Sequence, residues 1–206
     1  MKTTRNLLIA ALLTSAAHAG AMSNVDLAVK GSITPSACAP GISNGGLADF
    51  GKISAKDLKP DNETMLKGHY FQFTVTCEGA TLMGLQAKDN REGSDYTDRV
   101  DQFGLGLING SEKLGAMELS LSNPVADGVA SRMIHSEDGG LTWSNGRYLW
   151  RTNILSVADA SINAPIPVQQ FSSTLRIFTL IAPTSGLNLT EEVPIDGSVT
   201  LTVRYL

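Results

Sequence analysis

Residues 70–77 read YFQFTVTC, and every second side chain in this stretch is apolar. Successive side chains of a strand point to opposite faces of its sheet, so the pattern predicts a strand with one buried side. The chain ends in a second stretch of this kind, SVTLTVRYL at residues 198–206. The sequence predicts strands at both places. The side chains expected on the buried face of the first are Phe71, Phe73, Val75 and Cys77.

The rest of the chain also favours an all-β fold. Among 206 residues there are 20 Gly and 8 Pro, and these turn formers separate short runs rich in Val, Ile, Thr and Leu. Such spacing is typical of a β-sandwich, and the length suits a single domain. The further strands predicted are at residues 82–87, 103–108, 114–121, 141–151 and 175–181.

The charge content excludes several classes of protein. Only 17% of the residues are charged, which is too few for a coiled coil or a disordered tail. The formal net charge is -4, so there is no basic excess of the kind that neutralises phosphates. We expect no nucleic-acid partner.

The first residues have the features of a secretory signal. Lys2 and Arg5 precede an apolar run at residues 7–13, and Ala17-His18-Ala19 follows with small residues where a signal peptidase cuts. The pattern predicts a signal peptide at residues 1–19, and cleavage after Ala21 fits equally well. The run is too short to span a bilayer, so the predicted mature protein is exported.

Export determines how the two cysteines are interpreted. Cys38 and Cys77 are the only pair in the chain, and in an oxidising compartment they predict one disulfide. A loop of this length corresponds to about 4 kcal/mol in the chain-entropy model. A catalytic thiol is disfavoured because only His69 and His135 remain in the mature chain to activate it.

A further alternating stretch lies just after the predicted signal. Val25, Leu27 and Val29 share one face, and Gly31 follows directly, leaving no connection long enough to reverse the chain. This strand and the last strand of the chain both lie at termini. We expect each of them to pair with another protein chain.

One motif matches a known turn. Residues 136–143 read SEDGGLTW, which fits the S-x-D-x-G-x-T-W box of sialidase propeller blades. The box occurs once, and a propeller needs several blades. It therefore predicts a hairpin in which Asp138 caps the turn and Trp143 packs beneath it.

No motif supports an enzyme, a metal site or a cofactor. Residues 89–101 are rich in Asp, but the interleaved Arg91 and Arg99 favour a solvated loop over a calcium site. The glycines at residues 103–107 lack the spacing of a dinucleotide loop. The aromatic side chains of Trp143, Tyr148 and Trp150 raise the alternative of a stacking platform for carbohydrate, although packing in the core is the favoured explanation.

The features at the two ends of the chain together resemble a known family. Gly31-Ser32-Ile33 leads to Cys38, Cys77 ends a strand, and the last strand carries a penultimate Tyr205. This combination resembles a fimbrial subunit (pilin) of the chaperone-usher pathway. The motifs at residues 44–46, 89–91, 138–143 and 196–199 are most similar to the GltF-type branch of fimbrial-like proteins.

The resemblance implies an immunoglobulin-like sandwich that lacks its last strand, formed by residues 31–206. It implies a donor-strand extension at residues 20–30, and a chaperone-binding edge on the last strand. The implied partners are a periplasmic chaperone, an outer-membrane usher and neighbouring fimbrial subunits. The alternative is a secreted carbohydrate-binding module or adhesin that does not polymerise, with a host or surface carbohydrate as its ligand. The implied contact residues are Val25, Leu27 and Val29 in the extension, and Val199, Leu201, Val203 and Tyr205 in the edge.

Overall fold

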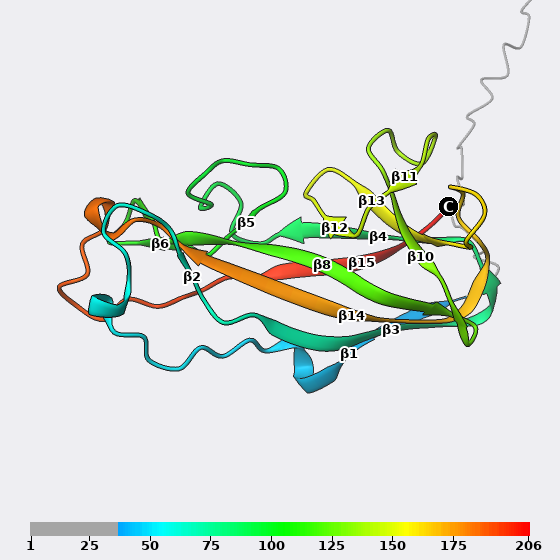
Figure 1. Cartoon of the computed structure of the whole chain (residues 1–206), viewed down its shortest axis with the longest axis horizontal. Coiled ribbons are helices and arrows are strands. Elements are labelled where there is room, and N and C mark those ends of the chain that lie inside the picture. Colours follow the sequence, from blue (N-terminus) through cyan, green and yellow to red (C-terminus); the bar gives the residue numbers. More distant parts are fainter. Residues whose placement is uncertain (1–36) are drawn as a thin grey trace, which may run out of the picture. The chain divides into compact units, whose positions relative to one another are not determined.

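The structure, a computed structural model, describes residues 37–206, which form an all-β fold (Figure 1). Within these residues, helical structure is limited to three short 3-10 turns. The predicted signal peptide at residues 1–19 and the predicted donor strand at residues 20–30 lie outside the described residues. The 3-10 turns are η1 (Ser43–Gly46), η2 (Ala55–Asp57) and η3 (Thr184–Gly186).

The larger of two main antiparallel sheets has eight strands, and five of them follow the order β1-β3-β14-β8-β12. Short strands β2, β5 and β9 attach to β14 or β8. The strands are β1 (Cys38–Ile42), β2 (Thr64–Met65), β3 (His69–Thr81), β5 (Phe103–Gly104), β8 (Gly115–Ala126), β9 (Val129–Ala130), β12 (Tyr148–Leu149) and β14 (Val168–Ile181).

The second main sheet has five strands in the order β11-β10-β13-β4-β15. A separate two-stranded ribbon is formed by β6 (Leu107–Ile108) and β7 (Glu112–Lys113). The five strands are β4 (Met83–Asp89), β10 (Arg132–Ser136), β11 (Ser144–Asn145), β13 (Ile154–Ala158) and β15 (Val199–Tyr205).

The core lies between these two sheets. The inward side chains of β3 and β14 alternate with outward polar ones, so Phe73 and Leu175 are buried while Gln72 is exposed. Leu85 and Leu155, paired in register across β4 and β13, are buried from the other sheet. The architecture is the all-β sandwich that the sequence predicts.

The strand order matches an immunoglobulin-like sandwich with one position unfilled. In that fold, strands A, B, E and D form one sheet and C, F and G form the other. Here β1-β3-β14-β8 occupies the first set, and β4 followed by β15 occupies C and F. Among the described residues no strand occupies the position beyond β15, so the last strand of the fold is missing, as expected.

The predicted disulfide is confirmed. Cys38 and Cys77 are bonded, with their Cα atoms 4.0 Å apart. The two residues are paired in register across β1 and β3, so the bond lies within one sheet. The disulfide therefore uses both cysteines of the chain.

Two predicted strands are wrong in extent. Residues 103–108 form β5 and β6 rather than one strand, because Gly106 has a φ of 87° and turns the chain between them. Residues 141–151 contain only β11 and β12, which belong to different sheets. Gly146 separates these two strands, and its backbone lies so close to the His135 ring that a side chain would clash.

Candidate groove between two sheet edges

Two strand edges remain unpaired on the same side of the sandwich. β1 ends the larger sheet with β3 as its neighbour, and β15 ends the smaller sheet with β4 as its neighbour. Among residues 37–206, no strand pairs with the free edge of either one. Such edges carry backbone N–H and C=O groups that are available to another strand.

The side chains of β15 alternate as predicted. Val199, Leu201 and Val203 pack against the core but stay only half-buried, while Thr200 and Thr202 are exposed. Side chains on the inner face of a complete sandwich would be fully covered. Their partial exposure shows that part of the core next to β15 is uncovered.

Tyr205 is the last of the four residues predicted on the chaperone-binding edge. Its side chain is 40% exposed, and its hydroxyl accepts a hydrogen bond from the Cys38 backbone N–H at 3.0 Å. This bond joins β15 directly to β1. It connects the two sheet edges at the end where β1 begins.

An open groove of about 550 Å³ lies between the two edges. One wall is β1 with the turn after it, and the other is the start of β15 with the residues before it. Apolar side chains from the larger sheet and from the loop between β5 and β6 form the floor. The floor residues are Phe73, Leu105, Met117, Leu119, Leu175 and Ile177.

A second hollow of about 650 Å³ continues the groove beyond β15. The two hollows share Leu47, Ala48, Phe50 and Ile195 in their lining. The Lys52 ammonium contacts the Glu192 carboxylate at 2.8 Å, so an exposed ion pair links the two walls here. The two hollows therefore form one groove that extends from β1 and the start of β15 to the residues that precede β15, with an apolar floor and polar rims.

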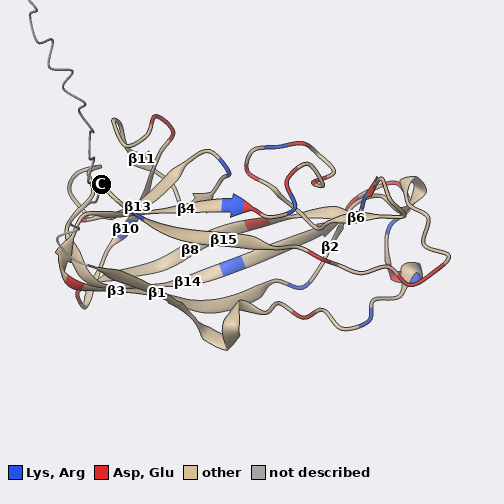
Figure 2. Cartoon of the chain, turned by 180° about the vertical axis from the view of Figure 1, so that it is seen from behind, with Lys and Arg blue, Asp and Glu red and all other residues tan. Residues whose placement is uncertain are grey.

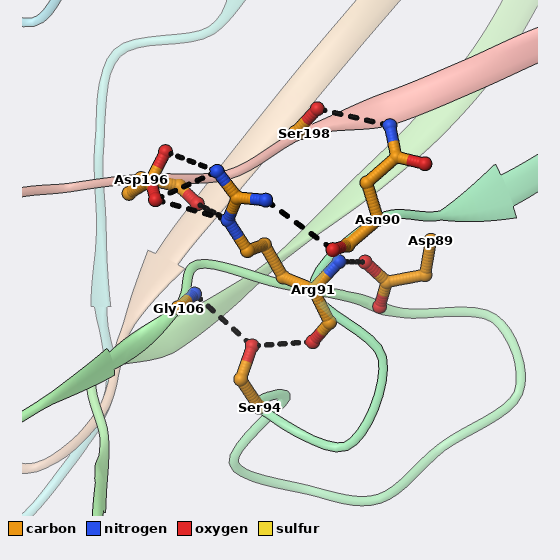
Figure 3. Close-up of polar contacts among 7 residues, drawn as sticks. All are labelled: Asp89, Asn90, Arg91, Ser94, Gly106, Asp196 and Ser198. Atoms are coloured by element: carbon orange, nitrogen blue, oxygen red, sulfur yellow. Dashed lines mark hydrogen bonds and ion pairs between the residues drawn. The ribbon is translucent and has the colours of Figure 1, made fainter. Parts of the chain in front are cut away.

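A polar network fixes the segment that leads into β15 (Figure 3). The Arg91 guanidinium donates from Nε to Asp196 Oδ2 at 2.9 Å and from Nη2 to Asp196 Oδ1 at 2.8 Å. The backbone N–H of Asp196 donates to the Leu105 carbonyl at 3.0 Å. Asp196 is thus held from both its side chain and its backbone. We call the contacts around this pair the Arg91–Asp196 network.

The loop that carries Arg91 is itself held in place. The Arg91 backbone N–H donates to Asp89, and Ser94 Oγ donates to the Arg91 carbonyl while accepting from the Gly106 N–H. Asn90 Nδ2 donates to Ser198 Oγ at 3.0 Å (Figure 3). The start of β15 is therefore anchored to the rest of the smaller sheet and not to β1.

The network changes the acidity of its members. Hydrogen bonding to Arg91 lowers the pKa of the Asp196 carboxyl below its usual value, and the carboxylate in turn raises the pKa of Arg91. Both side chains remain partly exposed, so this pair stabilises the protein only modestly.

Gly197, next to Asp196, lies directly against the groove floor. A Cβ atom at this position would come within 3.0 Å of both Leu105 and Met117. The glycine thus lets the chain approach the core closely before β15 begins.

The turn at residues 136–143 has the predicted structure. Asp138 Oδ1 accepts hydrogen bonds from Ser136 Oγ and from the N–H groups of Leu141 and Thr142, and Oδ2 accepts from Thr142 Oγ1. These bonds hold the pKa of the Asp138 carboxyl far below its usual range, and the bond from the Thr142 hydroxyl makes the largest contribution. Trp143 Nε1 donates to the Gly140 carbonyl at 3.1 Å, so the box is a local turn.

The three aromatic side chains proposed as a carbohydrate platform lie on different elements. Trp143 belongs to the turn before β11, and Trp150 packs against His135 with ring centroids 5.3 Å apart. Tyr148 projects from β12 on the outer face of the larger sheet. No ring contact joins any two of the three among the described residues.

The acidic loop at residues 89–101 pairs with arginines. Arg99 bonds Asp101 through two nitrogens, and the buried Asp95 contacts Arg151 Nη1 at 3.4 Å. Within residues 37–206 no group of three or more metal-binding side chains comes together. The same part of the chain contains no helix long and apolar enough to cross a membrane.

Comparison with known proteins finds relatives of the whole chain. A family model described as a protein of unknown function (DUF1120) matches residues 27–102. Protein GltF of Escherichia coli strain K12 is 27% identical over an alignment 241 positions long, which covers 96% of this chain and 95% of GltF. The uncharacterized protein YhcF of the same organism is 26% identical over an alignment 235 positions long, which covers 97% of this chain and 98% of YhcF. The predicted likeness to GltF-type proteins is therefore supported.

Proposed function

We propose that this protein is a structural fimbrial subunit whose groove is filled by a strand from another chain. A periplasmic chaperone fills the groove first, and the N-terminal extension of a neighbouring subunit then replaces it at an outer-membrane usher. The observation that carries this proposal is the pair of unpaired edges, β1 and β15, facing each other across an apolar floor.

The missing strand defines what the groove accepts. An extended segment lying beside β15 can use its free backbone groups, and every second side chain then points to the floor. In residues 20–30 of this sequence the alternating apolar side chains are Val25, Leu27 and Val29. This spacing matches the alternation of Val199, Leu201 and Val203 on β15.

The energetics favour filling the groove. Burying one Val or Leu side chain is worth roughly 1.5–3 kcal/mol, so three of them contribute about 5 kcal/mol or more. A contact between the extension of one subunit and the groove of the next does not close on itself. Repetition of it generates a filament.

Deletion of residues 23–30 tests the proposal in cells, and it leaves both candidate cleavage positions intact. A subunit lacking the extension still offers its groove but has no strand to donate. We expect the unaltered chain to form heat-labile, detergent-resistant oligomers on gels and the deletion to abolish them, while the exported monomer persists.

A chain with Lys30→Gln provides the matched control, since it keeps the apolar side chains of the extension and should still form oligomers. Oligomers that survive the deletion would contradict strand donation. The adhesin that does not polymerise would then become the leading function.

A further inference from the structure

A row of four side chains crosses the outer face of the larger sheet, away from the groove floor. Tyr70 on β3 is paired with Arg176 on β14, which is paired with Ser120 on β8, which is paired with Tyr148 on β12. Neighbouring strands lie about 4.8 Å apart, so the row spans about 14 Å. We call it the tyrosine row.

Both ends of the tyrosine row are open to solvent. The Tyr70 side chain is 61% exposed and that of Tyr148 is 44% exposed. Tyrosine is a large amphipathic ring that usually finds apolar cover, so two exposed rings on one face indicate a surface that stacks against a ligand.

Arg176 occupies the centre of this face and is held by aromatic rings. Its guanidinium carbon lies 3.9 Å from the Phe178 ring centroid and 5.7 Å from that of Tyr70. Its Nε is buried, and no described residue accepts a hydrogen bond from it. The stacking orients the guanidinium plane but leaves its donors unused.

The charge of Arg176 is not compensated within residues 37–206. The nearest acidic position in the sheet is Glu118, which faces Phe178 and accepts a hydrogen bond from Gln102 at 3.0 Å. Arg147 lies over the Tyr148 ring and bonds its hydroxyl, and it too has no carboxylate partner among the described residues. By contrast, Arg91, Arg99 and Arg151 all form ion pairs.

Apart from Glu118 and Arg147, the side chains around the row are polar but uncharged. Figure 2 shows β1 and β14 in tan except for one basic segment on β14. The outward positions beside the row carry hydroxyl and amide groups, which are less costly to desolvate than charges. These positions are Gln72 and Thr74 on β3, Ser172 and Thr174 on β14, and Ser122 on β8.

We propose that the tyrosine row binds an acidic polysaccharide that carries carboxylates. Sugar rings stack on Tyr70 and Tyr148, a carboxylate pairs with the Arg176 guanidinium, and hydroxyls bond the neighbouring polar side chains. Arginine is suited to this role because its planar fork matches a carboxylate. The site lies on a different face from the groove and does not depend on strand donation.

Binding of oligogalacturonate to the mature chain, measured by calorimetry, tests this site. Loss of a charge-assisted hydrogen bond weakens binding by about tenfold or more, so Arg176→Gln should do so. Arg204→Gln is the matched control, because it removes the same charge from an exposed position on β15 in the other sheet. It should change the affinity by less than about twofold.

Two further probes separate the site from general attraction of charge. A neutral maltooligosaccharide of equal length lacks the carboxylates, and polyglutamate lacks the sugar rings. Each should therefore bind at least about tenfold more weakly than oligogalacturonate. If Arg176→Gln does not fold, Arg147→Gln and Tyr148→Ala at the exposed end of the row replace it, and each should weaken binding severalfold.

Three results would overturn the proposal. The first is no binding of oligogalacturonate by the unaltered chain. The second is equal weakening by Arg176→Gln and Arg204→Gln, which would show non-specific attraction. The third is binding of polyglutamate as tight as that of the sugar, which would assign the row to acidic peptides.

Discussion

The two long sides of the sandwich treat their strand edges in opposite ways. On one side, the outer edge of β8 is covered in turn by β5, β12 and β9, each only two residues long. The buried Asn153 there donates to the Tyr148 carbonyl and accepts from the Trp150 N–H. On the other side, β1 and β15 are longer, and Tyr205 supplies one hydrogen bond between them.

The difference shows that strand edges are protected on one side of the sandwich and left open on the other. Proteins protect sheet edges with very short strands and side-chain hydrogen bonds, and the closed side does both. The open side has longer strands and only the one side-chain hydrogen bond from Tyr205, and it carries the strict alternation of apolar side chains in β15. An edge left open with this pattern is suited to receive another strand.

The largest effect expected on the open side comes from the disulfide, because β1 has no neighbour there except β3. Replacing Cys38 and Cys77 together with Ser should lower the stability by about 4 kcal/mol for the loop they close. Denaturant unfolding measures this. A replacement at Val129, which is exposed on the closed side, should have almost no effect. A loss below about 1 kcal/mol in the double variant would show that β1 is held mainly by other contacts.

A second comparison contrasts a core residue with one in the groove. Leu155→Ala on β13 should cost about 2–5 kcal/mol, since the side chain is fully buried. Leu201→Ala on β15 should cost about 1 kcal/mol in the isolated chain, because its side chain is only half-buried. Equal losses in urea unfolding would mean that the groove is already filled in the isolated protein.

The Arg91–Asp196 network should contribute less. Arg91→Met is expected to lower the stability only slightly, because the charges of an exposed ion pair are screened by solvent. Amide exchange at Asp196 should nevertheless accelerate, because the segment before β15 loses its anchor. Unchanged exchange in this variant would show that the Leu105 carbonyl alone holds the segment.

The smallest expected effect is on the stability of the protein at acidic pH. The lowered pKa of Asp138 means that its bonds stabilise the protein above the usual carboxyl pKa of about 3.9, and that this contribution declines as the pH falls toward the lowered value. The difference in Tm between the unaltered chain and Asp138→Asn should therefore be constant above about pH 5 and shrink below about pH 4. A difference independent of pH would mean that the carboxylate charge does not stabilise the turn.

The sequence predicted the features that rest on strict alternation or on a local motif. The stretches at residues 70–77 and 198–206 lie in β3 and β15, and the box at residues 136–143 is a turn held by Asp138. In each case the signal is contained within a few neighbouring residues.

The features that the sequence did not reveal depend on how segments far apart in the chain pack against one another. β13 is buried on both faces, so its sequence ILSVA shows no alternation. β1 contains Pro40 and Gly41, which read as a turn but are tolerated on an edge strand. The Arg91–Asp196 network and the tyrosine row join positions about a hundred residues apart, and no spacing rule connects them.

The central claim is that the groove beside β15 receives a donated strand. The most direct test moves residues 23–33 from their place to the end of the chain, joined to Leu206 by a short Asn-Gly-containing linker that permits a hairpin with β15. The comparison chain carries the same transfer with Val25, Leu27 and Val29 replaced by Ser. We expect the first chain to have a Tm higher by about 10 °C or more, corresponding to about 5 kcal/mol. Equal Tm values for the two chains would contradict the claim.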